Sequence, residues 1–123
     1  MNVSRAATVG TEGAPRVIGV LTHFVRDLIT ATYFRGFLQR EPARALRLLT
    51  TKESEIQRRY VAVVEALVRQ ELGEQPFGRG VSAHDLAYLL VRISESFTYA
   101  DLINGDRPSA ERARAAFELV LRP

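Results

Sequence analysis

Apolar residues recur at intervals of three or four positions along most of the chain from residue 15 onward. This period places them on one side of an α-helix, and no stretch of useful length shows the alternating pattern of a half-buried strand. No internal repeat is visible. The sequence therefore predicts an all-α domain, a bundle of about six helices. The first apolar stripe consists of Val17, Ile18, Leu21, Phe24, Val25, Leu28 and Ile29.

Prolines and short polar side chains indicate where the helices begin. Pro15 and Pro42 stand where a first helical turn tolerates proline, because the N–H that proline lacks would have no partner there. Residues 50–53 (TTKE) have the spacing of a capping box, in which the first and fourth residues serve each other's backbone N–H groups. Ser82 and Asp85 have a similar spacing, and Ser109 follows a proline at the start of the last predicted helix.

Glycines indicate where helices end. Gly73 closes one helix and begins the loop 73–80, and Gly105 suits a left-handed helix stop. Residues 1–14 are mostly small or polar and include two glycines. We therefore expect a flexible leader at 1–14 and one helical domain at 15–123.

The helix predicted over 82–103 has two different faces when successive residues are placed about 100° apart. One face is apolar and is expected to contact the core. The other is too aromatic for water and too charged for the core of a monomer. The first face consists of Leu86, Leu89, Leu90, Ile93, Phe97 and Ala100. The second consists of Tyr88, Val91, Glu95, Tyr99 and Leu102, flanked by Arg92, and the strip of Ala87, Ser94 and Asp101 is expected to be solvated.

Three interpretations of the second face remain open. It is a solvated surface with a local pair between Arg92 and Glu95, or a symmetric dimer interface, or the wall of a ligand pocket. Interfaces are rich in tyrosine and arginine, and a two-fold axis brings the same surface of two chains together. The spacing of three residues, on a face that is otherwise tyrosine, valine and leucine, predicts that Arg92 and Glu95 act as one unit rather than as two surface charges.

The chain is about one domain long, with 123 residues. It contains no cysteine, which excludes disulfides, thiolate metal sites and thiol catalysis. No apolar run approaches the length of a membrane span, and the first residues lack the apolar core of a signal peptide. We expect a cytoplasmic protein without membrane contact.

The net charge is +3, and residues 35–59 are the most basic part of the chain. Such a cluster can bind nucleic acid. Here acidic residues are interspersed, and no aromatic side chains alternate with the basic ones as a stacking platform requires. We therefore expect no DNA binding by this chain alone.

The titratable residues show no catalytic or metal-binding pattern. His23 and His84 are the only histidines and lack the spacing of metal ligands. Residues 78–83 match a dinucleotide-binding fingerprint, but no predicted strand precedes them. We expect no catalytic residue, no metal and no cofactor, and hence no enzyme.

A second group of apolar and aromatic side chains falls between the predicted helices. These residues line a cavity for a small apolar ligand, or they fill the core. The aromatic residues and the short helices over 30–50, broken at Pro42, keep the cavity open as an alternative to a filled core, because such segments can re-pack. The candidate ligand-binding residues are Phe24, Leu28, Phe34, Phe37, Tyr60, Val64 and Leu67.

Two segments together resemble a known family. Residues 92–103 (RISESFTYADLI) and 40–50 (REPARALRLLT) are similar to the C-terminal domain of TetR-family transcriptional regulators, in particular of QsdR-like members. The resemblance extends over about residues 16–121. Its most specific positions are Arg92, Glu95, Phe97, Tyr99, Ala100, Asp101 and Leu102.

The resemblance implies a ligand-sensing domain for a small apolar effector that forms a homodimer. The last two long helices, here 82–103 and 109–121, would pack against their copies as a four-helix bundle. The family's DNA-binding unit has no room before Arg16, so only effector binding and dimerisation are expected. The alternative is a stand-alone helical interaction protein that dimerises without a ligand. The expected interface residues are Tyr88, Val91, Arg92, Glu95, Tyr99, Phe117 and Leu121.

Overall fold

The part of the chain that the structure describes forms seven helices and no strand, in agreement with the helical spacing of apolar residues in the sequence. The structure is a computed structural model that describes residues 12–51, 55–76 and 80–121, with the backbone alone for 32–34. The predicted all-α fold is confirmed, with one helix more than the six expected. The helices are α2 (Ala14–Thr30), α3 (Thr32–Arg40), α4 (Pro42–Thr50), α5 (Glu55–Leu72), α6 (Ala83–Thr98), α7 (Ala100–Ile103) and α8 (Ala110–Leu121).

The predicted helix starts are confirmed where the chain is described. Pro15 lies in the first turn of α2, and Pro42 opens α4. The backbone N–H of Asp85 donates to Ser82 Oγ at 3.0 Å, so Ser82 caps α6. Ser109 caps α8 in the same way, accepting from the N–H three residues further on at 3.1 Å.

Two predicted helix ends are also confirmed. Gly73 follows the last residue of α5 with φ of 85°, and Gly105 follows α7 with φ of 81°. A residue with a Cβ is strained at these angles, which explains why glycine stands at both stops.

Two predictions fall partly on residues outside the described ranges. The capping box expected over 50–53 is one, and within the described part the Thr50 hydroxyl instead donates to the Leu46 carbonyl of its own helix at 2.6 Å. The leader expected over 1–14 is the other, and it stays a prediction.

The helix predicted as continuous over 82–103 breaks at Tyr99. Arg35 of α3 donates to the Thr98 carbonyl at 3.1 Å, and the N–H of Leu102 bonds instead to the Tyr99 carbonyl at 2.9 Å. The second guanidinium nitrogen of Arg35 contacts Asp101 Oδ2 at 2.6 Å. An arginine distant in sequence therefore takes an acceptor that a continuous helix would use, and α7 begins as a separate turn.

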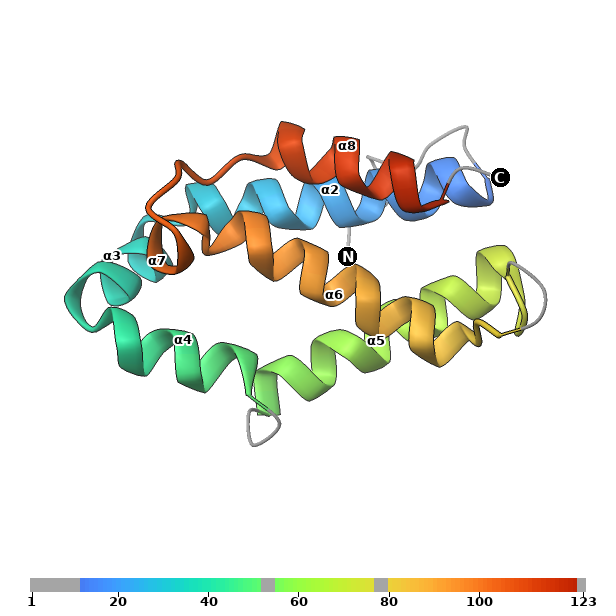
Figure 1. Ribbon diagram of the computed structural model, residues 1–123, viewed down its shortest axis with the longest axis horizontal. Coiled ribbons are helices and arrows are strands. Elements are labelled where there is room, and N and C mark those ends of the chain that lie inside the picture. Colours follow the sequence, from blue (N-terminus) through green and yellow to red (C-terminus); the bar gives the residue numbers. More distant parts are fainter. Residues whose placement is uncertain (1–11, 52–54, 77–79, 122–123) are drawn as a thin grey trace.

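The helices form layers around α6. α2 packs along α8, α5 packs along the opposite side of α6, and α3 and α4 form the far end of the molecule (Figure 1). A main core lies among α2, α5, α6 and α8. A second, smaller cluster lies among α3, α4 and the break between α6 and α7. The second cluster consists of Leu38, Ala45, Leu49 and Tyr99.

The burial of α6 corrects the face assignment made from the sequence. Ala87 and Ser94, expected in a solvated strip, are 0% and 1% exposed, whereas Leu89, expected in the core, is 45% exposed. The helix is covered by α2 and α8 on one side and by α5 on the other. The narrow strip between the two faces assigned from the sequence therefore becomes the centre of the buried surface. Small side chains there permit close approach of the neighbouring helices.

Candidate functional site

A cavity of about 380 Å³ lies between the two hydrophobic clusters. Leu21 and Val64 of the main core form part of its wall, and Leu49 and Tyr99 of the second cluster form another part. The two clusters pack separately, and side chains do not fill the space between them. The residues that line the cavity are Val20, Leu21, Phe24, Leu28, Leu49, Ile56, Gln57, Arg59, Tyr60, Val63, Val64, Leu67, Glu95 and Tyr99.

The wall is mostly aliphatic and aromatic. Phe24 of α2 and Tyr60 of α5 pack against each other with ring centroids 4.8 Å apart and join the two helices across the cavity. Ile56 and Val63 are 60% and 57% exposed, although both line the cavity. These α5 residues therefore mark the mouth, where apolar side chains meet solvent.

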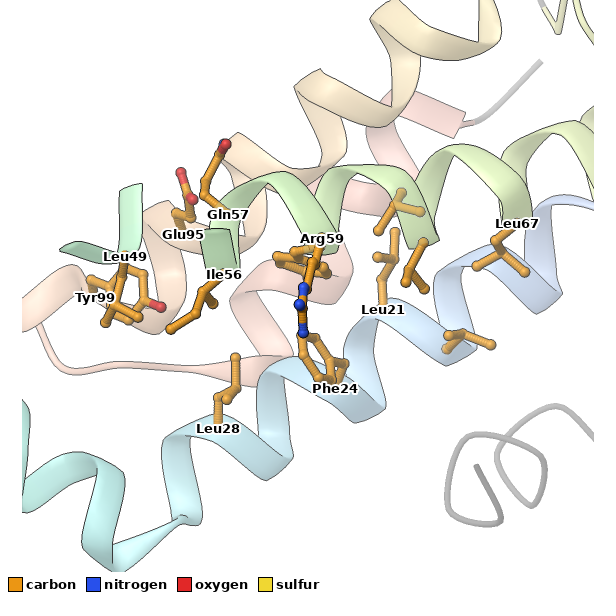
Figure 2. A pocket seen from close by; sticks show the side chains of 14 residues that line it. Leu21, Phe24, Leu28, Leu49, Ile56, Gln57, Arg59, Leu67, Glu95 and Tyr99 are labelled. Carbon is orange, nitrogen blue, oxygen red and sulfur yellow. The ribbon is translucent and has the colours of Figure 1, made fainter. Parts of the chain in front are cut away.

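Polar groups gather at one end of the cavity. Figure 2 shows Glu95, Gln57 and Tyr99 together near Leu49, with Leu67 at the opposite end. The buried polar groups thus lie at the end of the cavity next to Leu49 of α4, and the remaining lining is apolar or aromatic except for the exposed side chain of Arg59. This distribution suits a ligand with an apolar body and one polar group.

Glu95 is the charged group at the polar end, and its side chain is only 8% exposed. Burial raises the pKa of this carboxyl group, and the charge of Arg92 and hydrogen bonding by Arg92 and Gln57 oppose the rise only in part. Glu95 Oε1 accepts from Arg92 Nη1 at 2.9 Å, which confirms the predicted pairing of these two residues.

Arg92 connects this carboxylate to two other parts of the molecule. Its Nη1 also donates to the Thr50 carbonyl at the end of α4, at 2.9 Å, and its Nε donates to the Tyr88 hydroxyl at 3.2 Å. The guanidinium carbon lies 5.2 Å from the centre of the Tyr88 ring. The polar end of the cavity is therefore joined to the C-terminus of α4 through one side chain.

Two tyrosines lie beside Glu95 as neutral groups. Burial raises the pKa of Tyr60 and of Tyr99 far above the ordinary value, and the negative charge of Glu95 raises both further. Ser94 opposes the rise at Tyr60, although the buried Tyr60 hydroxyl makes no hydrogen bond of ordinary geometry. Both phenols therefore keep their protons and remain possible hydrogen-bond donors.

The structure brings five of the seven candidate ligand-binding residues together around this cavity. Phe37 is not among them, because it packs against the second cluster. The side chain of Phe34 lies outside the described part of the chain. The five residues that line the cavity are Phe24, Leu28, Tyr60, Val64 and Leu67.

Most of the expected interface residues are buried within the single chain. Val91, Phe117 and Leu121 belong to the main core, and Glu95 and Tyr99 line the cavity. These five side chains are therefore buried within one chain, because α6 turns its second face towards α5 and because Phe117 and Leu121 lie on the core side of α8. The two that reach the surface are Tyr88 and Arg92.

Among the polar residues that line the cavity, Gln57 was missed in the sequence. Gln57 precedes Tyr60 by three positions and Val64 by seven, a helical spacing that places all three on one face. This spacing could have revealed Gln57. Glu95 and Tyr99 belong to the face of α6 for which a pocket wall was one of three interpretations. The sequence could not select among them, because the position of these residues depends on which side of α6 is covered by α5.

Other titratable side chains form surface pairs. His84 Nδ1 lies 2.6 Å from Glu65 Oε1, and this contact and Arg69 hold the pKa of Glu65 below its ordinary value. Among the residues described, no group of three or more potential metal ligands comes together. In the same part of the chain, no helix has the length and apolarity that crossing a bilayer requires.

Comparison with known proteins supports the fold and gives the family. The solved structure of QsdR, a transcriptional repressor of R. erythropolis from the TetR family, matches with a TM-score of 0.77 at 20% sequence identity. The match covers 98% of this chain and 64% of the repressor, so the chain spans less than two thirds of that protein. No curated protein matches the chain. The family model described as "Tetracyclin repressor-like, C-terminal domain" matches residues 12–122, and the chain therefore belongs to this family of TetR C-terminal domains.

Proposed function

We propose that this domain senses a small, largely apolar molecule on behalf of a TetR-type transcriptional regulator and has no enzymatic activity. The observation that carries the proposal is the cavity of about 380 Å³ between the two hydrophobic clusters, lined mostly by apolar side chains with buried polar groups at one end. A sensor needs a space that the protein does not fill itself. A well-filled core would instead support the alternative, an interaction protein that dimerises without a ligand.

The proposed regulator domain forms a homodimer through the outer sides of α6 and α8. Arg112 of α8 lies over the Phe97 ring of α6 at 5.5 Å, so these outer sides adjoin. Leu119 of α8 is 75% exposed and Leu89 of α6 is also exposed. Exposed leucines on adjoining helices favour an interface there. Tyr88 and Arg92 lie towards its α5 edge, and of the interface residues expected from the sequence only these two remain candidates.

We assign no DNA-binding role to this domain. The matched family model is that of a C-terminal domain, and the described basic side chains are largely paired with acids, as in Arg58 with Glu55 and Arg69 with Glu65. We expect no sequence-selective shift of DNA by residues 1–123 in a gel assay. A salt-resistant, sequence-selective shift would contradict this part of the proposal.

Thermal-shift screening of the purified chain tests ligand sensing. The panel contains small apolar molecules that carry one polar group, matched with fully polar molecules of the same size. A ligand that binds only the folded state raises the melting temperature with concentration. We expect such a rise for members of the apolar set alone. No rise with any apolar compound would support the ligand-free interaction protein instead.

A further inference from the structure

We propose that the ligand of this cavity carries an uncharged head group with an O–H or N–H donor, which binds the Glu95 carboxylate while its apolar tail extends towards Leu67. This inference rests on the proposed ligand-sensing function and specifies the chemistry of the ligand. It comes from the contrast between the two ends of the cavity: Glu95, Gln57 and Tyr99 line one end, and Leu67 lies at the other (Figure 2).

Glu95 has capacity for further hydrogen-bond donors. An ionised carboxylate accepts about four hydrogen bonds and donates none. Glu95 Oε1 accepts from Arg92, and Gln57 also contributes to the hydrogen bonding of this group, yet burial still raises the pKa of Glu95. A further donor supplied by the ligand would therefore stabilise the buried carboxylate. A head group that carries only acceptors cannot form a hydrogen bond with the ionised carboxylate of Glu95.

The charges at the polar end favour a neutral head group. An anionic head group, such as a fatty acid carboxylate, would place a second negative charge beside Glu95 in surroundings of low polarity. A cationic head group would add to the charge of Arg92, which already neutralises Glu95 at 2.9 Å, and would leave one positive charge in excess. A neutral hydroxyl or amide N–H satisfies the carboxylate without either cost.

The volume of the cavity limits the length of the apolar tail. Since each water molecule in the liquid takes up about 30 Å³, a cavity of about 380 Å³ holds roughly a dozen such volumes. A compound with an eight-carbon chain and one head group fits this space. Arg59 also lines the cavity, but its Nε bonds to Glu55 Oε1 at 3.2 Å and its side chain is 78% exposed, so it does not change the charge at the buried end.

The experiment compares four probes of similar length by calorimetric titration of the purified wild-type chain. Octan-1-ol carries the donor, 1-methoxyheptane has the same number of heavy atoms without the donor, and octanoate and octylammonium carry the two charges. We expect octan-1-ol to bind about tenfold more tightly than the ether, the usual effect of one hydrogen bond to a charged group. Both charged probes should bind more weakly than the alcohol.

A variant assigns the preference to Glu95. In Glu95→Gln, we expect the preference for alcohol over ether to shrink to a few-fold and octanoate to gain affinity, because Arg92 no longer has a carboxylate partner. Glu111→Gln changes an exposed carboxylate on α8 and should leave all four affinities unaltered. Circular dichroism of both variants checks that they are folded.

The outcomes separate this inference from the proposed function. Equal binding of alcohol and ether, or tighter binding of either charged probe, overturns the inference and leaves the cavity as a ligand site. Binding by none of the four probes overturns both. Because the wild-type comparison of alcohol with ether is decisive by itself, the conclusion does not depend on the stability of Glu95→Gln.

Discussion

Glu95 lies in an environment that destabilises the ionised form of its carboxyl group. Its carboxyl group lies at the inner end of an apolar cavity, facing Gln57 of α5, its own-helix partner Arg92, and the neutral phenols of Tyr60 and Tyr99. Desolvation outweighs these partners, so the pKa of Glu95 in the folded chain lies above the ordinary value of about 4.3. A single buried residue therefore links the stability of the domain to pH.

The sign of this linkage gives a prediction for Glu95→Gln. Between the ordinary pKa of glutamate and the raised pKa of Glu95, the folded chain binds more protons than the unfolded chain, so this group's contribution to stability falls as pH rises. Above the raised pKa both states are ionised and the contribution is constant. The free energy of unfolding of the wild type minus that of Glu95→Gln should therefore decrease from about pH 4 upward and then level off.

Urea unfolding of both proteins at a series of pH values measures this difference. Glu111→Gln serves as the control, since the pKa of Glu111 is lowered, first by a backbone hydrogen bond and then by Arg26, and the corresponding difference should not fall with pH. A difference for Glu95→Gln that is flat or rises with pH would mean that Glu95 is not held in an unfavourable site.

At the scale of helices, the break at Tyr99 is the feature that shapes the polar end of the cavity. It lets Tyr99 pack against Leu49 of α4 and line the cavity at the same time. Arg35 holds the break, with a side chain that is only 15% exposed and bonds to both Thr98 and Asp101. α3 and α6 are thus joined at one guanidinium.

Replacement of Arg35 by alanine should be costly. It leaves the Asp101 carboxylate and the Thr98 carbonyl without this donor, and we expect a loss of about 1–3 kcal/mol in the free energy of unfolding. Arg44→Ala removes a well-exposed arginine paired with Glu41 and should cost under about 1 kcal/mol. Urea unfolding measures both, and equal small losses would show that Arg35 does not hold the break.

The sequence predicted the helix boundaries better than the helix faces. Pro42, Ser82 and Gly105 act locally, through a missing N–H, a side-chain acceptor and a left-handed backbone, so their effects can be read without knowledge of the fold. The buried side of α6 depends on its neighbours. A helix covered on two sides buries the strip between its apolar faces, and Ala87 and Ser94 looked solvated only because they are small or polar.

The same limit applies to the cavity. Phe24, Tyr60 and Val64 could be chosen from the sequence because they are apolar residues between predicted helices. For Glu95 and Tyr99 a pocket wall was only one of three open interpretations, because their contact with the cavity depends on the long-range arrangement of α4, α5 and α6. The break that positions Tyr99 is fixed by Arg35, 64 residues earlier in the chain.

For the whole molecule, the proposed dimer gives a prediction for Leu119. Its side chain is largely exposed on the outer side of α8. Leu119→Asp would place a charge in the proposed interface, where it loses water without gaining a partner, and should raise the dimer dissociation constant by at least about tenfold. Light scattering over a dilution series measures this constant.

Leu48→Asp is the matched control for the dimer prediction. Leu48 is exposed to a comparable degree to Leu89 but lies on α4, outside the proposed interface and the cavity wall. The dimer dissociation constant of Leu48→Asp should match that of the wild type. A wild-type chain that stays monomeric at tens of micromolar, or an unaltered dimer in Leu119→Asp, would contradict the proposed interface.

Whether the cavity is the ligand site is tested most directly by filling it. Leu28 lines the cavity from α2, and Leu28→Trp introduces a ring into the space, whereas Leu48→Trp makes the same change outside it. The measurement is calorimetric titration of one ligand from the thermal-shift panel into the wild type and both folded variants. We predict that Leu28→Trp binds at least about tenfold more weakly than the wild type and that Leu48→Trp binds equally well. Equal affinity for all three proteins would contradict the account, because the ligand would then bind elsewhere.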